Sequence, residues 1–144
     1  MIIVSLDPGN TTGVTIYRDS ELEFLETKDL DETYQLIVDT KPDVVVFEDY
    51  KIYPTKALDQ SWSQVYPVQV IGVIKLVSIL QGIPYVIQPT NIKKPIFTAL
   101  KTQRGIDAYE YWTKETLNPK VLRGKSQHIK DSYVHLIYYL KNRV

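Results

Sequence analysis

The chain has 144 residues, of which 44% are hydrophobic and 24% are charged, and it contains no cysteine. That length and composition predict one globular domain over residues 1–144, and the lack of cysteine excludes a disulfide framework and a thiolate metal site. No apolar run approaches the roughly 20 residues of a membrane span, and no signal-type segment opens the chain, so we expect a soluble cytoplasmic protein. Any metal ion must be held by oxygen or imidazole ligands, which favours Mg²⁺ or Mn²⁺.

Charge is unevenly distributed along the chain, although the formal net charge is zero. Residues 1–50 carry three Lys or Arg side chains against twelve Asp or Glu, and the rest of the chain carries fourteen against five. The two parts therefore have net charges of −9 and +9. The basic part could form a phosphate-binding surface, or these charges could simply be solvated surface.

The segment 2–7 is apolar and ends at Asp7, which predicts a buried strand with a carboxylate at its end. Gly9 and Gly13 follow, and they let the backbone turn or approach a ligand closely. A second strand is predicted over 14–17. Asp7 alone could equally be a turn residue that accepts hydrogen bonds from nearby backbone amides. Its function therefore depends on what the rest of the chain brings near it.

A third predicted strand, over 22–26, completes an antiparallel meander. Acidic side chains open a predicted helix over 31–38, and the segment 43–50 is a second buried strand that ends in carboxylates. Adjacent side chains of a strand point to opposite faces. Because it lies in phase with the buried apolar positions, Glu48 rather than Asp49 is the expected partner of the first carboxylate.

The middle of the chain predicts an apolar helix over 67–81, either the central packed helix or partly a dimer contact. A fifth strand over 85–88 would pair in parallel with the strand before that helix, through a right-handed crossover. A basic loop at 91–95 and a helical segment at 96–101 follow. Residues 102–126 include a short aromatic helical piece, and could form a mobile loop or an insertion against the sheet.

The last predicted helix begins after Ser126, which suits an N-cap, and runs to Leu140. His128 and Asp131 are three residues apart, so they project from the same side near the helix start. His135 lies one turn further on, and we expect it deeper, in packing or behind the site. Five apolar positions should pack on the sheet, namely 129, 133, 136, 137 and 140.

Three predicted elements thus begin or end at a carboxylate, namely Asp7, Glu48 and Asp131. If the strands that carry the first two are neighbours, the last helix brings the third onto them. Two charges about 4 Å apart repel by about 4 kcal/mol at an effective dielectric near 20, and a divalent cation turns this repulsion into attraction. Two Mg²⁺ ions about 3.5–4 Å apart would support in-line displacement at phosphorus.

The order of these motifs resembles the RuvC family of Holliday junction resolvases, within the ribonuclease H-like fold. The resemblance is carried by Asp7-Pro8-Gly9 with Thr12-Gly13, by Val46-Phe47-Glu48, and by the His128-x-x-Asp131 that opens the last helix. It implies an α/β fold with a five-stranded mixed sheet, in which a three-strand antiparallel meander joins two parallel strands, flanked by helices. It also implies a homodimer that uses magnesium to make paired nicks in four-way DNA, and the small size is similar to that of phage-borne members, which act in a bacterial or phage-infected host cell.

By the same resemblance, Asp7, Glu48 and Asp131 would be metal ligands, and His128 would be the fourth catalytic residue. An imidazole titrates near neutral pH, so His128 could hydrogen-bond the scissile phosphate or donate a proton. A histidine at a helix start can also be a plain surface residue, and its spacing from the aspartate favours the functional interpretation.

DNA contacts are expected from basic and aromatic side chains after the second acidic motif and after the fifth strand. Lysines would neutralise phosphates, and a tyrosine could stack on an unpaired base, although ordinary packing explains most tyrosines. Relatives often carry an aromatic residue three positions after the glutamate, where this chain has Lys51. The candidates are Tyr50, Lys51, Tyr53, Lys93, Lys94, Arg104 and Lys125, with Lys120 and Arg123 as weaker ones.

Three other functions are compatible with parts of this pattern. A nuclease of the same fold could process RNA, and a junction-binding module could have lost catalysis. The Asp-x-Gly-x-Thr pattern at Asp7 also resembles the phosphate loop of actin-like sugar kinases, but those need two lobes around a nucleotide. A chain of 144 residues is too short for that.

Overall fold

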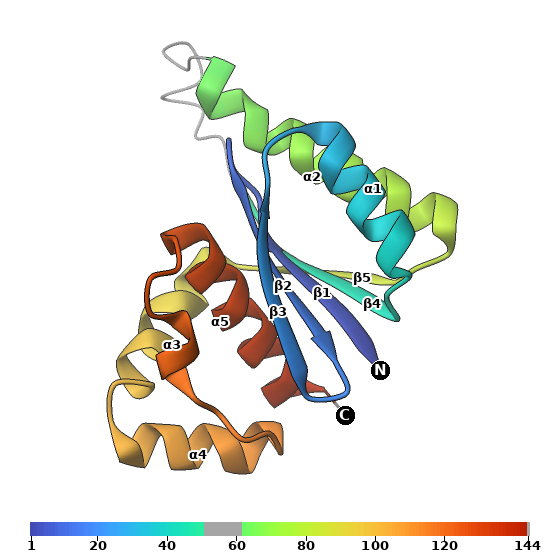
Figure 1. The fold of residues 1–144 in the computed structure, drawn as a ribbon. Helices are drawn as coiled ribbons and strands as arrows, with labels where there is room; N and C mark the ends of the chain where they lie inside the picture. Colours follow the sequence, from blue (N-terminus) through green and yellow to red (C-terminus); the bar gives the residue numbers. More distant parts are fainter. Residues whose placement is uncertain (51–61, 144) are drawn as a thin grey trace.

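Figure 1 shows the computed structural model of the protein, which describes residues 1–50 and 62–143. Five strands form one mixed sheet in the order β3-β2-β1-β4-β5. The first three strands form the predicted antiparallel meander, and β1, β4 and β5 run parallel to one another. The strand bounds are β1 (Ile2–Asp7), β2 (Thr12–Arg18), β3 (Glu21–Thr27), β4 (Val44–Glu48) and β5 (Tyr85–Gln88). The predicted fold class is confirmed.

Helices cover both faces of this sheet, and each face has its own apolar core (Figure 1). On one face, α1 (Leu30–Thr40) and α2 (Trp62–Gln81) pack on Val4, Leu6 and Phe47. On the other face, α5 (Gln127–Asn142) packs on β1, β2 and β4. The helices α3 (Lys93–Ala99) and α4 (Gln103–Thr113) lie against α5. The short 3₁₀ helices η2 (Thr90–Ile92) and η3 (Pro119–Leu122) contribute Ile92 and Leu122 to the same apolar cluster.

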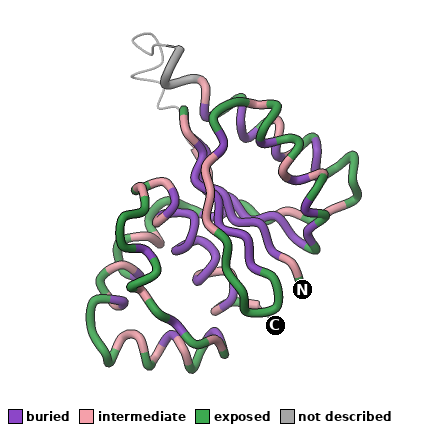
Figure 2. The backbone as a smooth tube through the Cα atoms, viewed as in Figure 1, coloured by how far each residue is buried: buried purple, intermediate pink, exposed green. Residues whose placement is uncertain are grey.

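The central strands are buried on both faces, which explains their nearly continuous apolar sequences (Figure 2). All five residues of β4 are buried, as are the last five of β1. The outer hairpin between β2 and β3 is exposed and polar. The site residues at the ends of β1 and β4 therefore stand on the buried centre of the sheet.

Two boundary predictions are wrong. The helix expected from Pro67 begins at Trp62, and Pro67 lies within it. The segment 91–95, predicted as a loop, is already helical from Lys93 onward, because the 3₁₀ turn before it continues directly into α3. Residues 102–126, which the sequence leaves open, contain α4 and η3, whose apolar side chains cluster with those of α5. The segment also contacts the sheet, because the Tyr17 hydroxyl on β2 donates to Glu115.

The N-cap and the burial predicted for the last helix are confirmed. The Ser126 side chain accepts a hydrogen bond from the backbone N–H of Ile129, which caps α5. The five positions predicted to pack on the sheet are all buried, and Leu136 and Leu140 belong to the core of this face of the sheet. Tyr133 and Ile137 instead belong to the cluster that α5 forms with α3 and α4. His135 is fully buried, as expected. Among the helices of the described residues, none combines the length and apolar character that crossing a membrane requires.

Candidate active site

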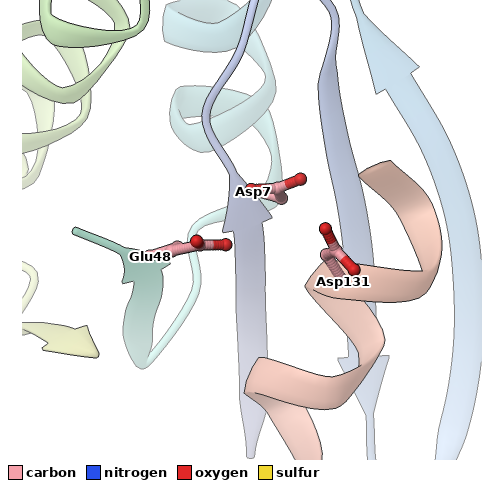
Figure 3. Close-up of side chains that lie close together, drawn as sticks. All are labelled: Asp7, Glu48 and Asp131. Atoms are coloured by element: carbon pink, nitrogen blue, oxygen red, sulfur yellow. The ribbon is translucent and has the colours of Figure 1, made fainter. Parts of the chain in front are cut away.

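Three buried carboxylates meet at one edge of the sheet (Figure 3). Asp7 is the last residue of β1 and Glu48 the last of β4, and these strands are parallel neighbours, so both side chains emerge at the same edge. Asp131, in the first turns of α5, points at them from the adjacent helix. One oxygen of each carboxylate lies within 4.8 Å of the others. The structure thus brings together the three acids that the sequence predicted.

Gly13 explains how α5 comes so close to the end of β1. A Cβ atom on Gly13 would lie 2.1 Å from the backbone carbon and oxygen of His128 and 2.5 Å from the nitrogen of Ile129. A Cβ on Gly9 would lie 2.9 Å from the oxygen of Thr11 and 3.1 Å from Cε1 of His128. Neither glycine has a positive φ. Gly13 therefore makes room for the start of a helix, and Gly9 lies in the predicted turn between β1 and β2. Close approach of a ligand to either glycine stays a prediction.

A buried polar contact fixes α5 along the sheet. The Ser5 hydroxyl donates to the backbone oxygen of Ser132 at 2.7 Å, and the hydroxyls of Thr15 and Ser132 lie 2.7 Å apart. All three residues are fully buried. Since a buried polar group without a partner is costly, sliding the helix along the sheet would break these bonds. This contact holds Asp131, the neighbour of Ser132, at its height above β1.

Lys93 places a positive charge among the carboxylates. Its Nζ atom lies 3.0 Å from Oε1 of Glu48 and 3.4 Å from Oδ2 of Asp131. This lysine opens α3, which continues from the short η2 that follows β5. The sequence predicts Lys93 as a DNA contact, whereas the structure places its ammonium against the acids.

His128 contacts the acid at the end of β1. Its Nδ1 atom lies 2.9 Å from Oδ2 of Asp7, and 45% of its side chain is exposed. Asp131 is held from its own helix, because the side-chain amide of Gln127 donates to its Oδ1 at 2.7 Å. His128 therefore stands beside the acids with part of its ring facing solvent.

A fully buried histidine supports Glu48 from behind. Nε2 of His135 lies 3.1 Å from Oε2 of Glu48, and Nδ1 lies 2.7 Å from Oε1 of Gln88, the last residue of β5. Both oxygens of Glu48 therefore have partners, one in Lys93 and one in His135. Gln88 was not among the predicted site residues, although a polar residue at the end of an otherwise apolar strand is a signal.

The crowded charges shift the pKa values of the two acids in opposite directions. Burial, followed by the hydrogen bond and negative charge of Glu48, raises the pKa of Asp7 to about 9. Burial also raises the pKa of Glu48, but hydrogen bonds from His135, Asp7 and Lys93 outweigh this effect and lower it to about 2. Burial lowers the pKa of Lys93, and its contacts with the acids more than offset this, so the net shift is upward. The apo site therefore favours one protonated and one ionised acid.

The composition of this cluster fits a metal ion. The three acids offer only oxygen donors, which suit hard divalent cations. Their buried negative charge is met by a side-chain ammonium, which is the compensation that a cation would provide. The Asp7, Glu48 and Asp131 cluster could therefore hold a metal ion.

Comparison with solved structures finds proteins of the same fold. RuvC of Thermus thermophilus, solved in complex with a Holliday junction substrate, superposes with a TM-score of 0.62 and 12% sequence identity over 96% of this chain and 92% of that chain. Fowlpox virus resolvase, in a complex with substrate Holliday junction DNA, superposes with a TM-score of 0.56 and 16% identity over 98% of this chain and 97% of that chain. The chain has the RuvC-type resolvase fold. No family model and no curated protein sequence matches it.

On this RuvC-type fold, the predicted DNA contacts occupy different places. Tyr50 is half-buried and packs on the apolar core, and Lys94 is exposed beside the site in the first turn of α3. Arg104 is exposed in the first turn of α4, and Nζ of Lys125 lies 5.8 Å from the centre of the Phe24 ring. Lys51 and Tyr53 lie outside the described residues.

Proposed function

We propose that this protein is a structure-selective endonuclease that resolves four-way or branched DNA junctions by metal-dependent phosphodiester hydrolysis. The observation that carries the proposal is the cluster of three buried carboxylates at the end of two parallel strands. Its position on a RuvC-type fold supports junction DNA as the substrate, since both resolvases compared above were solved with a Holliday junction.

In this proposal Asp7, Glu48 and Asp131 are the metal ligands, for two Mg²⁺ ions that Mn²⁺ can replace. When bound, such ions supply Lewis-acid activation of water and stabilise the leaving oxygen. The chain's own residues hold the three carboxylates in place through the strand ends, the Ser132 contact and His135. Binding of cations also relieves the repulsion that keeps a proton on Asp7 in the apo site.

His128 is the proposed fourth catalytic residue. Its Nδ1 contacts Asp7, which orients the ring, and the exposed part of the side chain can reach a bound phosphodiester. A proton held on the imidazole would then be available to the leaving oxygen or to a phosphate oxygen. His135 is the less suitable candidate for this task, because it is fully buried.

Phosphate binding is assigned to the basic part of the chain. Lys94, Arg104 and Lys125 are exposed, and Lys93 borders the acids. Tyr50 is a candidate for base contact rather than phosphate contact, and Lys51 and Tyr53 continue the same segment in the sequence. Removing any one of these basic side chains should weaken DNA binding and flatten its dependence on salt.

A homodimer is the proposed assembly, because a four-way junction presents two equivalent strands and one subunit has a single carboxylate cluster among its described residues. The apolar side of α2 suits the contact. Leu76, Ile79 and Leu80 are 56%, 65% and 64% exposed, which is unusual for neighbouring large apolar side chains. Ile79→Glu should convert the dimer to a monomer in sedimentation experiments, whereas Leu22→Glu on exposed β3 should not. A wild-type monomer at all concentrations would overturn the assembly.

Cleavage of a labelled immobile four-way junction, with and without Mg²⁺, tests the function. Wild type should nick opposed strands only with the metal, and Asp7→Asn should bind the junction without cutting it. Intact junctions under all metals would refute the enzyme and favour a binding module, and preferential cutting of structured RNA would favour the ribonuclease. Equal cutting by Asp7→Asn would refute the site while leaving the function.

A further inference from the structure

The aromatic helical piece within residues 102–126 forms the C-terminal end of α4, where two neighbouring rings are exposed. Tyr111 is 78% exposed and Trp112 is 45% exposed, whereas Tyr109 is buried beside them. The ring of Trp112 stands edge-on to that of Tyr109, with the ring centres 5.1 Å apart. Tyrosine and tryptophan are enriched at the centres of protein interfaces, so two exposed rings on one helix end indicate a contact surface.

Two lysines adjoin these rings. Nζ of Lys141, in the last turn of α5, lies 4.6 Å from the centre of the Trp112 ring and 5.4 Å from that of Tyr109. Lys114 is exposed at the C-cap of α4, three residues after Tyr111. An ammonium group over a ring is attracted by the ring electrons and holds the ring in place. We call Tyr111, Trp112, Lys114 and Lys141 the aromatic patch.

The charge of the aromatic patch is positive and uncompensated. Neither of its lysines forms an ion pair with an acid in the described part of the chain. The nearby acids do have partners, because the backbone N–H of Leu117 donates to Glu110 at 3.2 Å and a guanidinium nitrogen of Arg143 lies 3.5 Å from Glu115. The complementary ligand therefore combines negative charge with an apolar group.

The aromatic patch lies away from the surfaces that the proposed function uses. Asp131 is near the start of α5 and Lys141 is in its last turn, so they are about 15 Å apart along the helix axis. The end of α4 that carries the rings lies beside the C-terminal end of α5 (Figure 1). The helix α2, proposed as the dimer contact, packs on the opposite face of the sheet. The patch therefore remains available for a further partner.

A protein segment fits this surface better than a single nucleic-acid strand does. A strand carries regularly spaced phosphates and binds along a continuous path of positive charge. Arg104, Asp107 and Tyr111 are exposed at spacings of three and four residues, so they share one side of α4. A strand that runs from Arg104 to the patch would pass the carboxylate of Asp107. A peptide can instead place its carboxylates opposite the two lysines alone.

We propose that the aromatic patch docks an acidic segment of a partner protein, and that this segment carries a large apolar side chain. Carboxylates of the segment pair with Lys114 and Lys141, and its apolar side chain packs on Tyr111 and Trp112. Tyr111 is the most exposed of these rings, so it provides the main contact, as tyrosines at the centres of interfaces do. The partner is thereby held without covering the carboxylate cluster.

Fluorescence anisotropy with two labelled peptides tests this inference. The acidic probe is a fluorescein-labelled peptide in which Asp and Glu residues flank one Phe, and the neutral probe has Asn and Gln in their place. Wild type should bind the acidic probe with a micromolar Kd and the neutral probe at least about tenfold more weakly. Tyr111→Ser should weaken binding of the acidic probe about tenfold, and Lys114→Gln should weaken it too. Tyr34→Ser, at a 40% exposed tyrosine of α1, is the control and should leave it unchanged.

The outcomes separate this surface from the nuclease site. Absence of saturable binding of the acidic probe overturns the inference, and so does equal binding of the neutral probe. Full binding by folded Tyr111→Ser shows that the peptide binds elsewhere and also overturns it. Oligothymidylate that binds wild type but not Tyr111→Ser, and that the acidic probe does not displace, would assign the patch to single strands instead. Tyr111→Ser should cut junctions like wild type, so failure of the docking surface leaves the proposed function standing.

Discussion

Nε2 of His135 lies 3.1 Å from Oε2 of Glu48, while Nδ1 of the same ring lies 2.7 Å from Oε1 of Gln88. The ring is fully buried, so both contacts are shielded from water. Hydrogen bonds to a metal-binding side chain commonly fix its orientation, and removing them costs about 10–100-fold in metal affinity or activity. His135 is therefore a positioning residue for Glu48.

Replacing His135 should weaken metal binding while leaving the DNA surface intact. We expect His135→Ala to lower the affinity for Mn²⁺ about 10–100-fold in calorimetry, because Glu48 loses the group that orients it. His135→Gln should recover part of that affinity, since its amide can donate to the carboxylate. Folded His135→Ala protein with wild-type Mn²⁺ affinity would show that the histidine serves packing alone.

Lys93 should have opposite effects on metal binding and on apo stability. Its ammonium neutralises Glu48 and Asp131, so Lys93→Met should lower the free energy of unfolding by about 1–3 kcal/mol in metal-free buffer. The same change removes a competing positive charge, and Mg²⁺ should bind more tightly and restore the stability of the variant.

Urea unfolding with and without Mg²⁺ measures both effects of the lysine. Lys94→Met provides the control, because this neighbouring lysine is exposed and forms no ion pair with the acids among the described residues. Equal responses of the two variants to Mg²⁺ would contradict the assigned role of Lys93.

The three acids could be predicted because each belongs to a pattern that is visible in the sequence itself. Asp7 and Glu48 end apolar strands, and Asp131 follows His128 at helical spacing. Contacts made by polar residues from distant elements leave no such pattern. The residues around Lys93 are typical of a basic loop. Nothing in the local sequence indicates that this lysine begins a helix next to the acids.

The residues that fix the last helix could not be predicted either, for a physical reason. Ser5, Thr15 and Ser132 are single polar positions within apolar segments, and their meaning lies in pairing across the sheet. Gly13 stands out in the sequence, but its φ is not positive, so no turn geometry requires a glycine there. Its role is visible only once the position of the His128 backbone, which occupies the space of a Cβ, is known. Predicting either feature requires the helix position in advance.

Gly13→Ala should damage both stability and catalysis, because its Cβ would overlap the backbone of His128, which cannot rotate away. We expect a decrease of about 1–3 kcal/mol in the free energy of unfolding, the usual cost of overpacking. Cleavage should fall more than stability explains, since the helix that carries Asp131 must shift away from Asp7. Junction cleavage in a single turnover, at a temperature where the variant is folded, measures this.

Gly9→Ala is the comparison variant, because Gly9 also lies close to the start of α5 but with milder contacts. Its Cβ would meet Thr11 oxygen at 2.9 Å and a movable imidazole carbon at 3.1 Å, so we expect a smaller decrease in stability. If Gly13→Ala retains wild-type cleavage, or if Gly9→Ala is the more damaging change, close helix approach is not what Gly13 provides.

Asp7 should make apo stability depend on pH in a defined direction. Its pKa is about 9 in the folded protein against 3.8 for an ordinary aspartate, so the folded state keeps a proton that the unfolded chain releases. Stability from this group is therefore present at low pH and is lost as the pH rises from about 4 toward 9. Glu48 acts oppositely, because its pKa is lowered to about 2, and its contribution is lost as the pH falls below about 4.5.

Asp7→Asn should remove the loss of stability that Asp7 causes as the pH rises. In metal-free buffer near pH 8, we expect the variant to be more stable than wild type by at least about 1.4 kcal/mol, the equivalent of one pKa unit. The difference should vanish near pH 3, which lies below both the folded and the ordinary pKa of Asp7, so the wild-type side chain is largely protonated whether folded or unfolded. Added Mg²⁺ should reverse the order at pH 8, because only the wild type has a full set of ligands. Urea titrations at both pH values, with EDTA or Mg²⁺, measure these differences. A wild type that is more stable than the variant in EDTA at pH 8 would show that the pKa of Asp7 is not raised in the folded protein.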